Sequence, residues 1–270
     1  MRQFEFIHKK KLTKKQKQHY IKIYEGLVKL IKEECSKKGE NQEQRIKALQ
    51  ATLITVVSRY PELLYMKSYE GDKDAYSTTF QQKLNIYGLI DVLENICQDV
   101  NVCELEAFGH ISLLFSIVIY KNFDFAKGQD EKRFELVKSL LKKHPELLTF
   151  RDGRYNENLG MYLIRELNAD NKQAELLIPI IKMFIEDPDA CRQRDGDGYN
   201  LGMLAAKYKI KELFDLAVKN AQARKQKNFN GDTMEIIAKN NGIQVPTLTD
   251  KEIYFHYREI LDEKIDDICK

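Results

Sequence analysis

Hydrophobic positions in the N-terminal part of the chain recur at spacings of three and four, which is the period of an amphipathic helix. The first such stretch follows Thr13-x-x-Gln16, a pattern typical of a capping box at a helix N-terminus. The second stretch begins near Asn41 and ends at Pro61, because proline cannot continue a helix. The apolar positions are Tyr20, Ile23, Tyr24, Leu27, Val28 and Ile31 in the first stretch and Ile46, Leu49, Leu53, Val56, Val57 and Tyr60 in the second. We expect two helices that pack as a hairpin.

Most of the remaining chain keeps the helical period, and no segment shows a convincing period-two alternation. The stretch 69–79 is polar and contains Gly71-Asp72, so it predicts a loop. The run 111–120 is almost entirely apolar but too short to cross a bilayer, which predicts a buried helix. The further helices expected are 84–97, 105–120, 131–143, 158–167, 173–186 and a final helix at about 249–269.

Composition agrees with a helical fold. Thirteen glycines and five prolines in 270 residues supply few turns for a sandwich or barrel built from many hairpins. Five cysteines at scattered positions, an odd number, form no disulfide framework, and no apolar run approaches the ~18 residues of a membrane span. These features predict a soluble chain in a reducing, cytoplasmic compartment, without a transmembrane segment.

Short motifs recur along the chain. Arg151-Asp152-Gly153 returns as Arg194-Asp195-Gly196, and Asn158-Leu159-Gly160-Met161 returns as Asn200-Leu201-Gly202-Met203. The interval between the two Asn-Leu-Gly-Met motifs is one residue shorter than the interval between the two Arg-Asp-Gly motifs. One residue has therefore been lost within the turn that separates the two motifs. Pro61-Glu62-Leu63-Leu64 returns as Pro145-Glu146-Leu147-Leu148, at twice the interval of the Asn-Leu-Gly-Met pair.

Farther along, the interval shortens. Asp195, Gly198, Asn200 and Ala205 correspond to Asn228, Gly231, Thr233 and Ala238. Glycine suits a left-handed turn position, and the Asp and Asn side chains of these turns can bond back to nearby backbone amides. The small side chains of Ala205 and Ala206 permit a close approach between helices.

At this point the chain resembles the ankyrin-repeat family, whose unit of about 33 residues is a turn followed by two antiparallel helices. The step from Asp195 to Asn228 has this length. The family signature stands here as Gly198-Tyr199-Asn200-Leu201-Gly202-Met203-Leu204-Ala205-Ala206, which keeps the glycine and the paired alanines. The Thr, Pro, Leu and His of the signature are replaced, which removes the usual Thr–His hydrogen bonding and predicts less regular repeats. The likeness is good over 188–241, weaker over 108–187 and only suggestive before that.

The resemblance implies an all-α solenoid of degenerate ankyrin-like helix pairs with helical caps. We expect a non-repeat helical region at 1–107, the repeats at 108–245 and a C-terminal capping helix at 246–270. Each helix pair exposes one apolar face that its neighbour covers, so the ends require atypical units.

In that family the turn tips and the first helix of each pair form a concave face that binds partner proteins. Carried over by position, the protein-binding residues expected here are Arg151, Asp152, Arg154, Tyr155, Arg194, Asp197, Tyr199, Asn228, Phe229 and Asp232. Arginine and aromatic side chains are enriched at interfaces because they bury a large area and carry polar groups. The partner expected is a protein of unknown identity, and a host protein is one possibility. These side chains can equally serve only to complete their turns.

Charge adds an alternative for the N-terminal region. Residues 1–38 contain 12 Lys and Arg against four Asp and Glu, a net charge of +8, whereas the remaining chain carries −5. Clustered ammonium groups displace counterions from phosphates, so the lysines between Lys9 and Lys17 suit nucleic acid or an anionic membrane. They also suit the solvated face of a helix. The lysines are Lys9, Lys10, Lys11, Lys14, Lys15 and Lys17.

Candidate catalytic groups are few. Cys97, Cys103 and His110 are the nearest approach to a thiol–imidazole pair, but cysteines on apolar helices usually behave as small buried hydrophobes. Asp195 and Asp197 suggest a calcium loop, yet Tyr199 occupies the next ligand position. With no paired metal-ligand motif and no phosphate-binding glycine loop, we expect neither metal nor cofactor.

The final predicted helix is acidic and partly apolar, and it ends in Ile268-Cys269-Lys270. This ending resembles the C-terminal export signals of proteins that intracellular bacteria inject into host cells, a group rich in ankyrin-type chains. It implies, as an alternative, a secreted effector without a cleaved signal peptide, with an enzymatic pocket in the N-terminal region. A capping helix with a solvated acidic face explains the same residues.

Overall fold

The computed structural model describes residues 3–6, 12–37, 39, 41–69, 77–96, 112–119, 130–153, 156–169 and 173–247. These residues are mostly helical, as the hydrophobic periodicity predicts. The chain divides into two compact units, Met1–His144 and Pro145–Lys270. The domain boundaries expected at 107/108 and 245/246 stay predictions, and the expected final helix at 249–269 lies outside the described residues.

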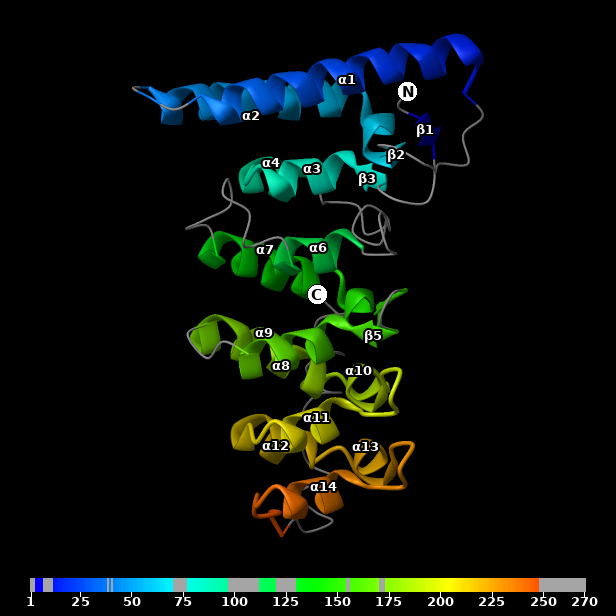
Figure 1. The fold of residues 1–270 in the computed structure, drawn as a ribbon, viewed down its shortest axis with the longest axis vertical. Coiled ribbons are helices and arrows are strands. Elements are labelled where there is room, and N and C mark those ends of the chain that lie inside the picture. Colours follow the sequence, from blue (N-terminus) through cyan, green and yellow to red (C-terminus); the bar gives the residue numbers. More distant parts are fainter. Residues whose placement is uncertain are drawn as a thin grey trace, which may run out of the picture. The chain divides into compact units, whose positions relative to one another are not determined.

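The first unit begins with the expected helical hairpin. Helices α1 (Lys14–Ser36) and α2 (Gln42–Arg59) lie side by side and bury one face of each against the unit (Figure 1). The predicted capping box is present: the Gln16 amide donates to Thr13 Oγ1 at 3.3 Å, and the Thr13 amide donates to Gln16 Oε1 at 2.9 Å. Helix α2 ends before Pro61, as expected, and Pro61 opens a short 3₁₀ helix, η1 (Pro61–Tyr65).

Three short strands of this unit were not predicted. Strands β1 (Gln3–Phe6), β2 (Met66–Tyr69) and β3 (Ser77–Thr79) form one antiparallel sheet in the order β1-β2-β3. The prediction of a loop over 69–79 is therefore wrong at both of its ends. Strands of three or four residues are too short to show an alternating pattern, and they form because distant segments of the chain pair with each other.

The other helices of the first unit are α3 (Phe80–Ile86), α4 (Ile90–Ile96), α6 (Leu113–Ile119) and α7 (Asp130–Lys143). The single helix expected at 84–97 is broken because Gly88 adopts a left-handed conformation with φ of 71°. Residues 113–118 are almost completely buried, which agrees with the predicted buried helix.

One buried cation joins three of these helices. Arg133 of α7 is 1% exposed, and its guanidinium donates to the Asn85 carbonyl at 2.8 Å, to the Ile117 carbonyl at 3.0 Å and to Asn85 Oδ1. Asn85 Nδ2 donates in turn to the Ser116 carbonyl at 2.6 Å. Burial lowers the pKa of Arg133 to about 10, so the side chain is still charged at neutral pH.

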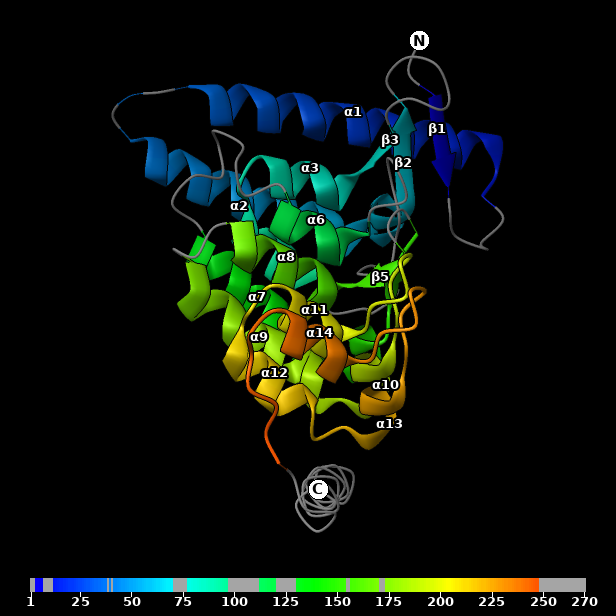
Figure 2. The same cartoon turned by 60° about the horizontal axis from the view of Figure 1, so that its bottom comes forward.

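The second unit is built from short helices with hairpin turns between them. Its elements are η5 (Pro145–Leu148), β4 (Arg151–Asp152), β5 (Glu157–Asn158), α8 (Leu159–Ala169), α9 (Ala174–Glu186), α10 (Pro188–Arg192), α11 (Leu201–Lys207), α12 (Lys211–Ala217), α13 (Ala221–Lys225) and α14 (Met234–Asn240). Helix α11 packs against α8 on one side and α14 on the other, while α10 and α13 lie together beside this stack (Figures 1 and 2).

The glycine shared by the two Asn-Leu-Gly-Met motifs lies where helices approach most closely. A Cβ atom on Gly160 of α8 would lie 2.6 Å from Phe184 Cγ of α9. A Cβ atom on Gly202 of α11 would lie 2.8 Å from Met234 Cε of α14 and 3.0 Å from Ala217 Cβ of α12. A side chain at Gly160 would therefore overlap Phe184, whereas one at Gly202 would displace the end of the Met234 side chain and press on Ala217. Gly26 of α1 has no neighbour within 4 Å.

These contacts predict that replacing glycine with alanine destabilises the protein at two helical positions and stabilises it at a third. Gly160→Ala and Gly202→Ala should lower the free energy of unfolding by about 1–3 kcal/mol, because the new methyl group displaces a packed neighbour. Gly26→Ala should raise it by up to about 1 kcal/mol, since alanine is the better helix former and the methyl group meets open space. Urea unfolding followed by circular dichroism measures all three, and stabilisation at Gly202 would contradict the packing argument.

The buried guanidinium predicts a second stability effect. Arg133→Met should lower the free energy of unfolding by about 2–4 kcal/mol, because Asn85 and the Ile117 carbonyl lose buried hydrogen-bond donors. Lys142→Met removes a positive charge from an exposed position of the same helix and should change stability by less than about 0.5 kcal/mol. Equal effects of the two substitutions in the same urea measurement would show that Arg133 has no structural role.

Candidate functional site

Two successive turns of the second unit share one hydrogen-bond pattern. Asp195 Oδ1 accepts from the amides of Asp197 at 3.0 Å and Tyr199 at 2.8 Å. Asn228 Oδ1 accepts from the amides of Asn230 at 3.0 Å and Asp232 at 2.9 Å. The prediction that the side chains of Asp195 and Asn228 bond back to nearby backbone amides is therefore confirmed. It also accounts for the acidic pattern at Asp195 without a calcium ion.

A residue with a left-handed backbone ends each turn. In the turn at Asp195 this residue is Gly198, with φ of 85°, and in the turn at Asn228 it is Gly231, with φ of 87°. In the turn that precedes both, it is Asn156, with φ of 52°. The Gly198 amide donates to the carbonyl three residues back, whereas the Asn156 amide donates to Asp152, four residues back. The one-residue difference between the two repeats therefore lies between Asp152 and Asn156.

An asparagine after each of the first two turns joins successive repeats. Asn158 Oδ1 accepts from the Met161 amide at 3.0 Å and caps α8, while its Nδ2 donates to the Ala190 carbonyl at 3.1 Å. Asn200 repeats both bonds at 2.9 Å, with the Met203 amide and the Ala223 carbonyl. The sequence did not predict that one asparagine both caps its helix and bonds to a distant carbonyl. The recurrence of asparagine at the same position of the motif could have indicated it.

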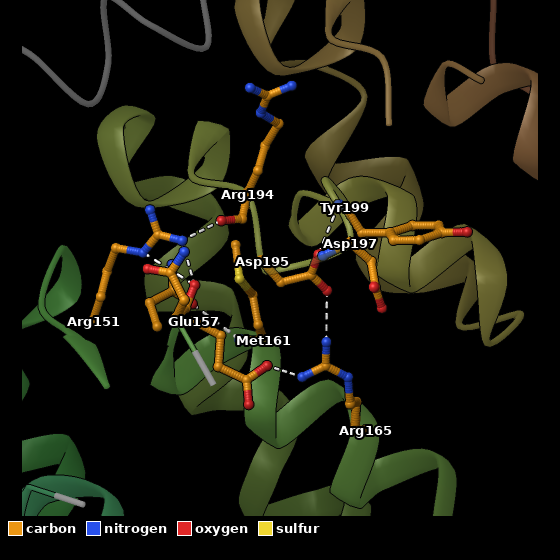
Figure 3. A network of polar contacts seen from close by, with 10 residues as sticks. Arg151, Glu157, Met161, Arg165, Arg194, Asp195, Asp197 and Tyr199 are labelled. Atoms are coloured by element: carbon orange, nitrogen blue, oxygen red, sulfur yellow. Dashed lines mark hydrogen bonds and ion pairs between the residues drawn. The ribbon is translucent and has the colours of Figure 1, made fainter. Parts of the chain in front are cut away.

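Two of the expected binding residues bridge successive turns, and two others are buried. The guanidinium of Arg151 donates to the Arg194 carbonyl (Figure 3). Arg194 Nη1 donates to the Lys227 carbonyl at 3.2 Å, so each arginine bridges to the next turn. Asp152 and Asn228 are buried, with exposed fractions of 1% and 5%. Asp152 and Asn228 therefore offer little surface to a partner, whereas Arg194 stays exposed despite its bond to the Lys227 carbonyl.

Four other expected residues lie at the surface. Asp197 is exposed, Tyr199 and Asp232 are half-buried, and Phe229 is 71% exposed. The Phe229 ring lies against Gly198, because a Cβ atom there would be 3.0 Å from Phe229 Cδ1. Lys207 Nζ lies 4.5 Å from the centroid of the Tyr199 ring, a cation–π contact. The remaining two expected residues, at 154 and 155, are outside the described part of the chain.

Arg165 of α8 joins two buried carboxylates from different turns. Its Nη2 lies 2.6 Å from Asp195 Oδ2, and its Nη1 pairs with Glu157 Oε2 (Figure 3). Both carboxylate side chains are at most 3% exposed, whereas Arg165 is 33% exposed. The sequence gives no signal for Arg165, because nothing in the helical pattern indicates which charged residue faces the neighbouring turn.

A pocket of about 450 Å³ opens beside this ion-pair cluster. Four carboxylates and one guanidinium line it, for a formal charge of −3. The lining residues are Glu157, Tyr162, Arg165, Glu166, Asp195, Gly196 and Asp197. A cationic side chain of a partner is the group that such a lining suits.

The groups considered for catalysis have no supporting geometry in the described residues. The cysteines at 97 and 103 and the histidine at 110 lie outside them, and no group of three or more His, Cys, Asp or Glu side chains within them is arranged to hold a metal ion. Burial, with a smaller effect of Asp187, raises the pKa of Cys191 to about 12. That thiol is neutral at physiological pH and therefore a poor nucleophile.

A smaller pocket, of about 270 Å³, lies in the first unit between α2 and α4. Asp91 on its wall is bonded by Gln50 Nε2 at 3.1 Å and by Lys132 Nζ at 3.2 Å, while Lys47 pairs with Glu43 at 2.7 Å. The charged groups of this pocket thus neutralise one another.

Comparison with models of known protein families, with curated proteins and with solved structures finds no match to this chain. The described helices contain no segment with the length and hydropathy that a membrane span requires.

The ion-pair cluster predicts a large effect of one substitution. Arg165→Met should lower the free energy of unfolding by about 2–4 kcal/mol, because Glu157 and Asp195 then stay buried without a cation. Arg192→Met breaks an exposed pair with Asp189 and should cost less than about 1 kcal/mol. Urea unfolding of both variants checks this, and a neutral Arg165→Met would show that the cluster does not stabilise the turns.

Proposed function

We propose that this chain is a non-enzymatic scaffold that binds a partner protein through the turns of stacked, ankyrin-like helix pairs. The turn bonds of Asp195, which Asn228 repeats in the next turn, support the repeat assignment. So does the packing of α11 between α8 and α14, since a helix pair that needs a neighbour on each side is typical of repeat proteins.

Phe229 is the observation that carries the proposal. It is a large apolar side chain at the tip of a turn, 71% exposed, and among the described residues only Ile236 is comparable, at 44%. Because an aromatic ring gains much free energy when a partner covers it, exposed aromatic residues frequently act as binding anchors. Tyr199, in the preceding turn, provides a second ring with a polar group.

The face we propose is narrower than the sequence predicts. Asp152 and Asn228 are buried and Arg151 is bonded within the scaffold, which leaves Asp197, Tyr199, Phe229, Asp232 and the exposed Arg194 to contact a partner. Arg154 and Tyr155 are included in the proposed binding face because of their sequence positions alone. The acidic pocket next to Asp197 favours a partner segment that combines an apolar group for Phe229 with a basic side chain.

The experiment is a quantitative affinity capture with the full chain as bait. A Tyr199→Ser/Phe229→Ser variant should lose at least about tenfold of the partner signal, because it removes the anchor rings. Ile236→Ser is the matched control, since it removes an exposed apolar side chain from α14 and leaves the turns intact. Circular dichroism establishes that all three baits are folded.

A partner that binds the wild type and the Ile236→Ser variant equally, and the double variant poorly, would support the proposal. Captured proteins that bind all three baits equally would eliminate the turn face as the binding surface. Turnover of a small-molecule substrate by the purified chain would contradict the non-enzymatic assignment.

A further inference from the structure

The N-terminal half of α1 carries an unbalanced positive charge. Between residues 14 and 24 there are four lysines and no acidic residue. Farther along, Lys29 pairs with Glu33 in the same helix, and Lys37, directly after its end, pairs with Glu34. In contrast, Lys14, Lys15 and Lys22 are exposed and make no ion pair with any described residue. Because these side chains face solvent, their charge is accessible to an external anion.

The position of these lysines is locally unfavourable. The N-terminal end of a helix carries a partial positive charge, and here the first turn contains Lys14, Lys15 and Lys17 with no acidic residue. The Thr13 capping box already satisfies some of the free backbone amides at this helix end. An anion would therefore contact the lysine side chains. Its binding would reduce the repulsion between these lysines and the partial positive charge of the helix N-terminus.

A cluster of aromatic rings adjoins these lysines. His19 is exposed, and its ring centroid lies 5.7 Å from that of Tyr60, at the end of α2, with the planes at 73°. Tyr20 lies 6.1 Å from Tyr60 at 84°, and the Arg59 guanidinium is 5.6 Å from the Tyr60 centroid. This edge-to-face packing holds the His19 ring next to the lysines, where a planar ligand can stack on it.

An acidic group of the same unit adjoins the aromatic rings. Glu62 of η1 hydrogen-bonds to Tyr20, and burial together with this bond raises the pKa of Tyr20 to about 12. Tyr20 is therefore neutral at physiological pH. This part of the surface has two carboxylates, Glu25 and Glu62, against five cations, so its net charge is positive. The cations are Lys14, Lys15, Lys17, Lys22 and Arg59.

We propose that the lysines of α1 and the His19–Tyr60 rings bind single-stranded nucleic acid. The ammonium groups of Lys14, Lys15 and Lys22 would contact phosphates, and an unpaired base would stack on His19. This combination of a positive surface with aromatic rings is the usual means of binding single strands without sequence preference. At 1.5 Å of rise per residue, Lys14 and Lys22 are about 12 Å apart along the helix, which corresponds to a few nucleotides.

Two observations favour this ligand over an anionic membrane. The apolar face of α1, which includes Tyr24, Leu27 and Ile31, is buried within the unit and so cannot enter a lipid layer. No described residue of α1 is an exposed large hydrophobic side chain. Duplex nucleic acid is disfavoured because its bases are already stacked and cannot reach an exposed ring.

The test is fluorescence anisotropy of a labelled 20-nucleotide oligo-uridine with the full chain between 50 and 200 mM salt. Wild type should bind with a steep loss of affinity as salt rises. A Lys14→Gln/Lys15→Gln/Lys22→Gln variant should bind at least about tenfold more weakly at 50 mM salt. Its slope of log affinity against log salt should be smaller by about 2, at about 0.7 for each lysine.

Two further variants separate the contributions. His19→Ala should weaken binding at least about fivefold without changing the salt slope, because stacking releases no counterions. A Lys225→Gln/Lys227→Gln/Lys239→Gln variant makes the same change in net charge at exposed positions of the second unit and should bind like wild type.

Three results would overturn the proposal. They are no binding by wild type at 50 mM salt, equal losses in the two lysine variants, and binding to vesicles of mixed phosphatidylcholine and phosphatidylserine without binding to oligo-uridine. A matching 20-base-pair RNA duplex that binds as tightly as the single strand would remove the stacking role of His19.

Discussion

The second unit depends on how closely its short helices approach one another. Gly160 and Gly202 lie at the points of contact, where even one methyl group would overlap Phe184 or Met234. Phe184 belongs to α9, which pairs with α8, and Met234 belongs to α14, the next helix of the stack, so close approach is needed both within a helix pair and between pairs. Asn158 and Asn200 add a polar link of the same kind, because each caps its own helix and bonds to a carbonyl of the following repeat.

This arrangement separates the residues that build the turns from those that a partner can reach. Arg151 and Arg194 bridge from turn to turn, and Arg165 ties two buried carboxylates together. With the backbone fixed in this way, the turn tips that hold Phe229 and Tyr199 would need little ordering in the binding that we propose. Preorganisation of that kind lowers the entropic cost of association.

The sequence predicted the main helices and the recurrence of the turns at Asp195 and Asn228, because both leave periodic patterns in the chain. It did not predict the short strands β1 to β3 or the break at Gly88, since three or four residues carry too little pattern. Among the candidate site residues it identified the turns but not their roles: Phe229 lies at the surface as expected, whereas Arg194 bonds to the backbone of the next turn. The importance of Arg165 depends on two partners from different turns, which no local pattern indicates.

Hydrophobic spacing, the Thr13 cap and the recurrence of the turn motifs by themselves determined where the helices lie and that the turns repeat, because these features depend on interactions between residues close in sequence. Only the tertiary structure decided which side chains face the scaffold and which face solvent. Arg133 and Lys142 belong to the same polar class on one helix, yet the first is buried among backbone carbonyls and the second is exposed. That difference follows from the neighbouring elements, and the sequence of the helix does not contain it.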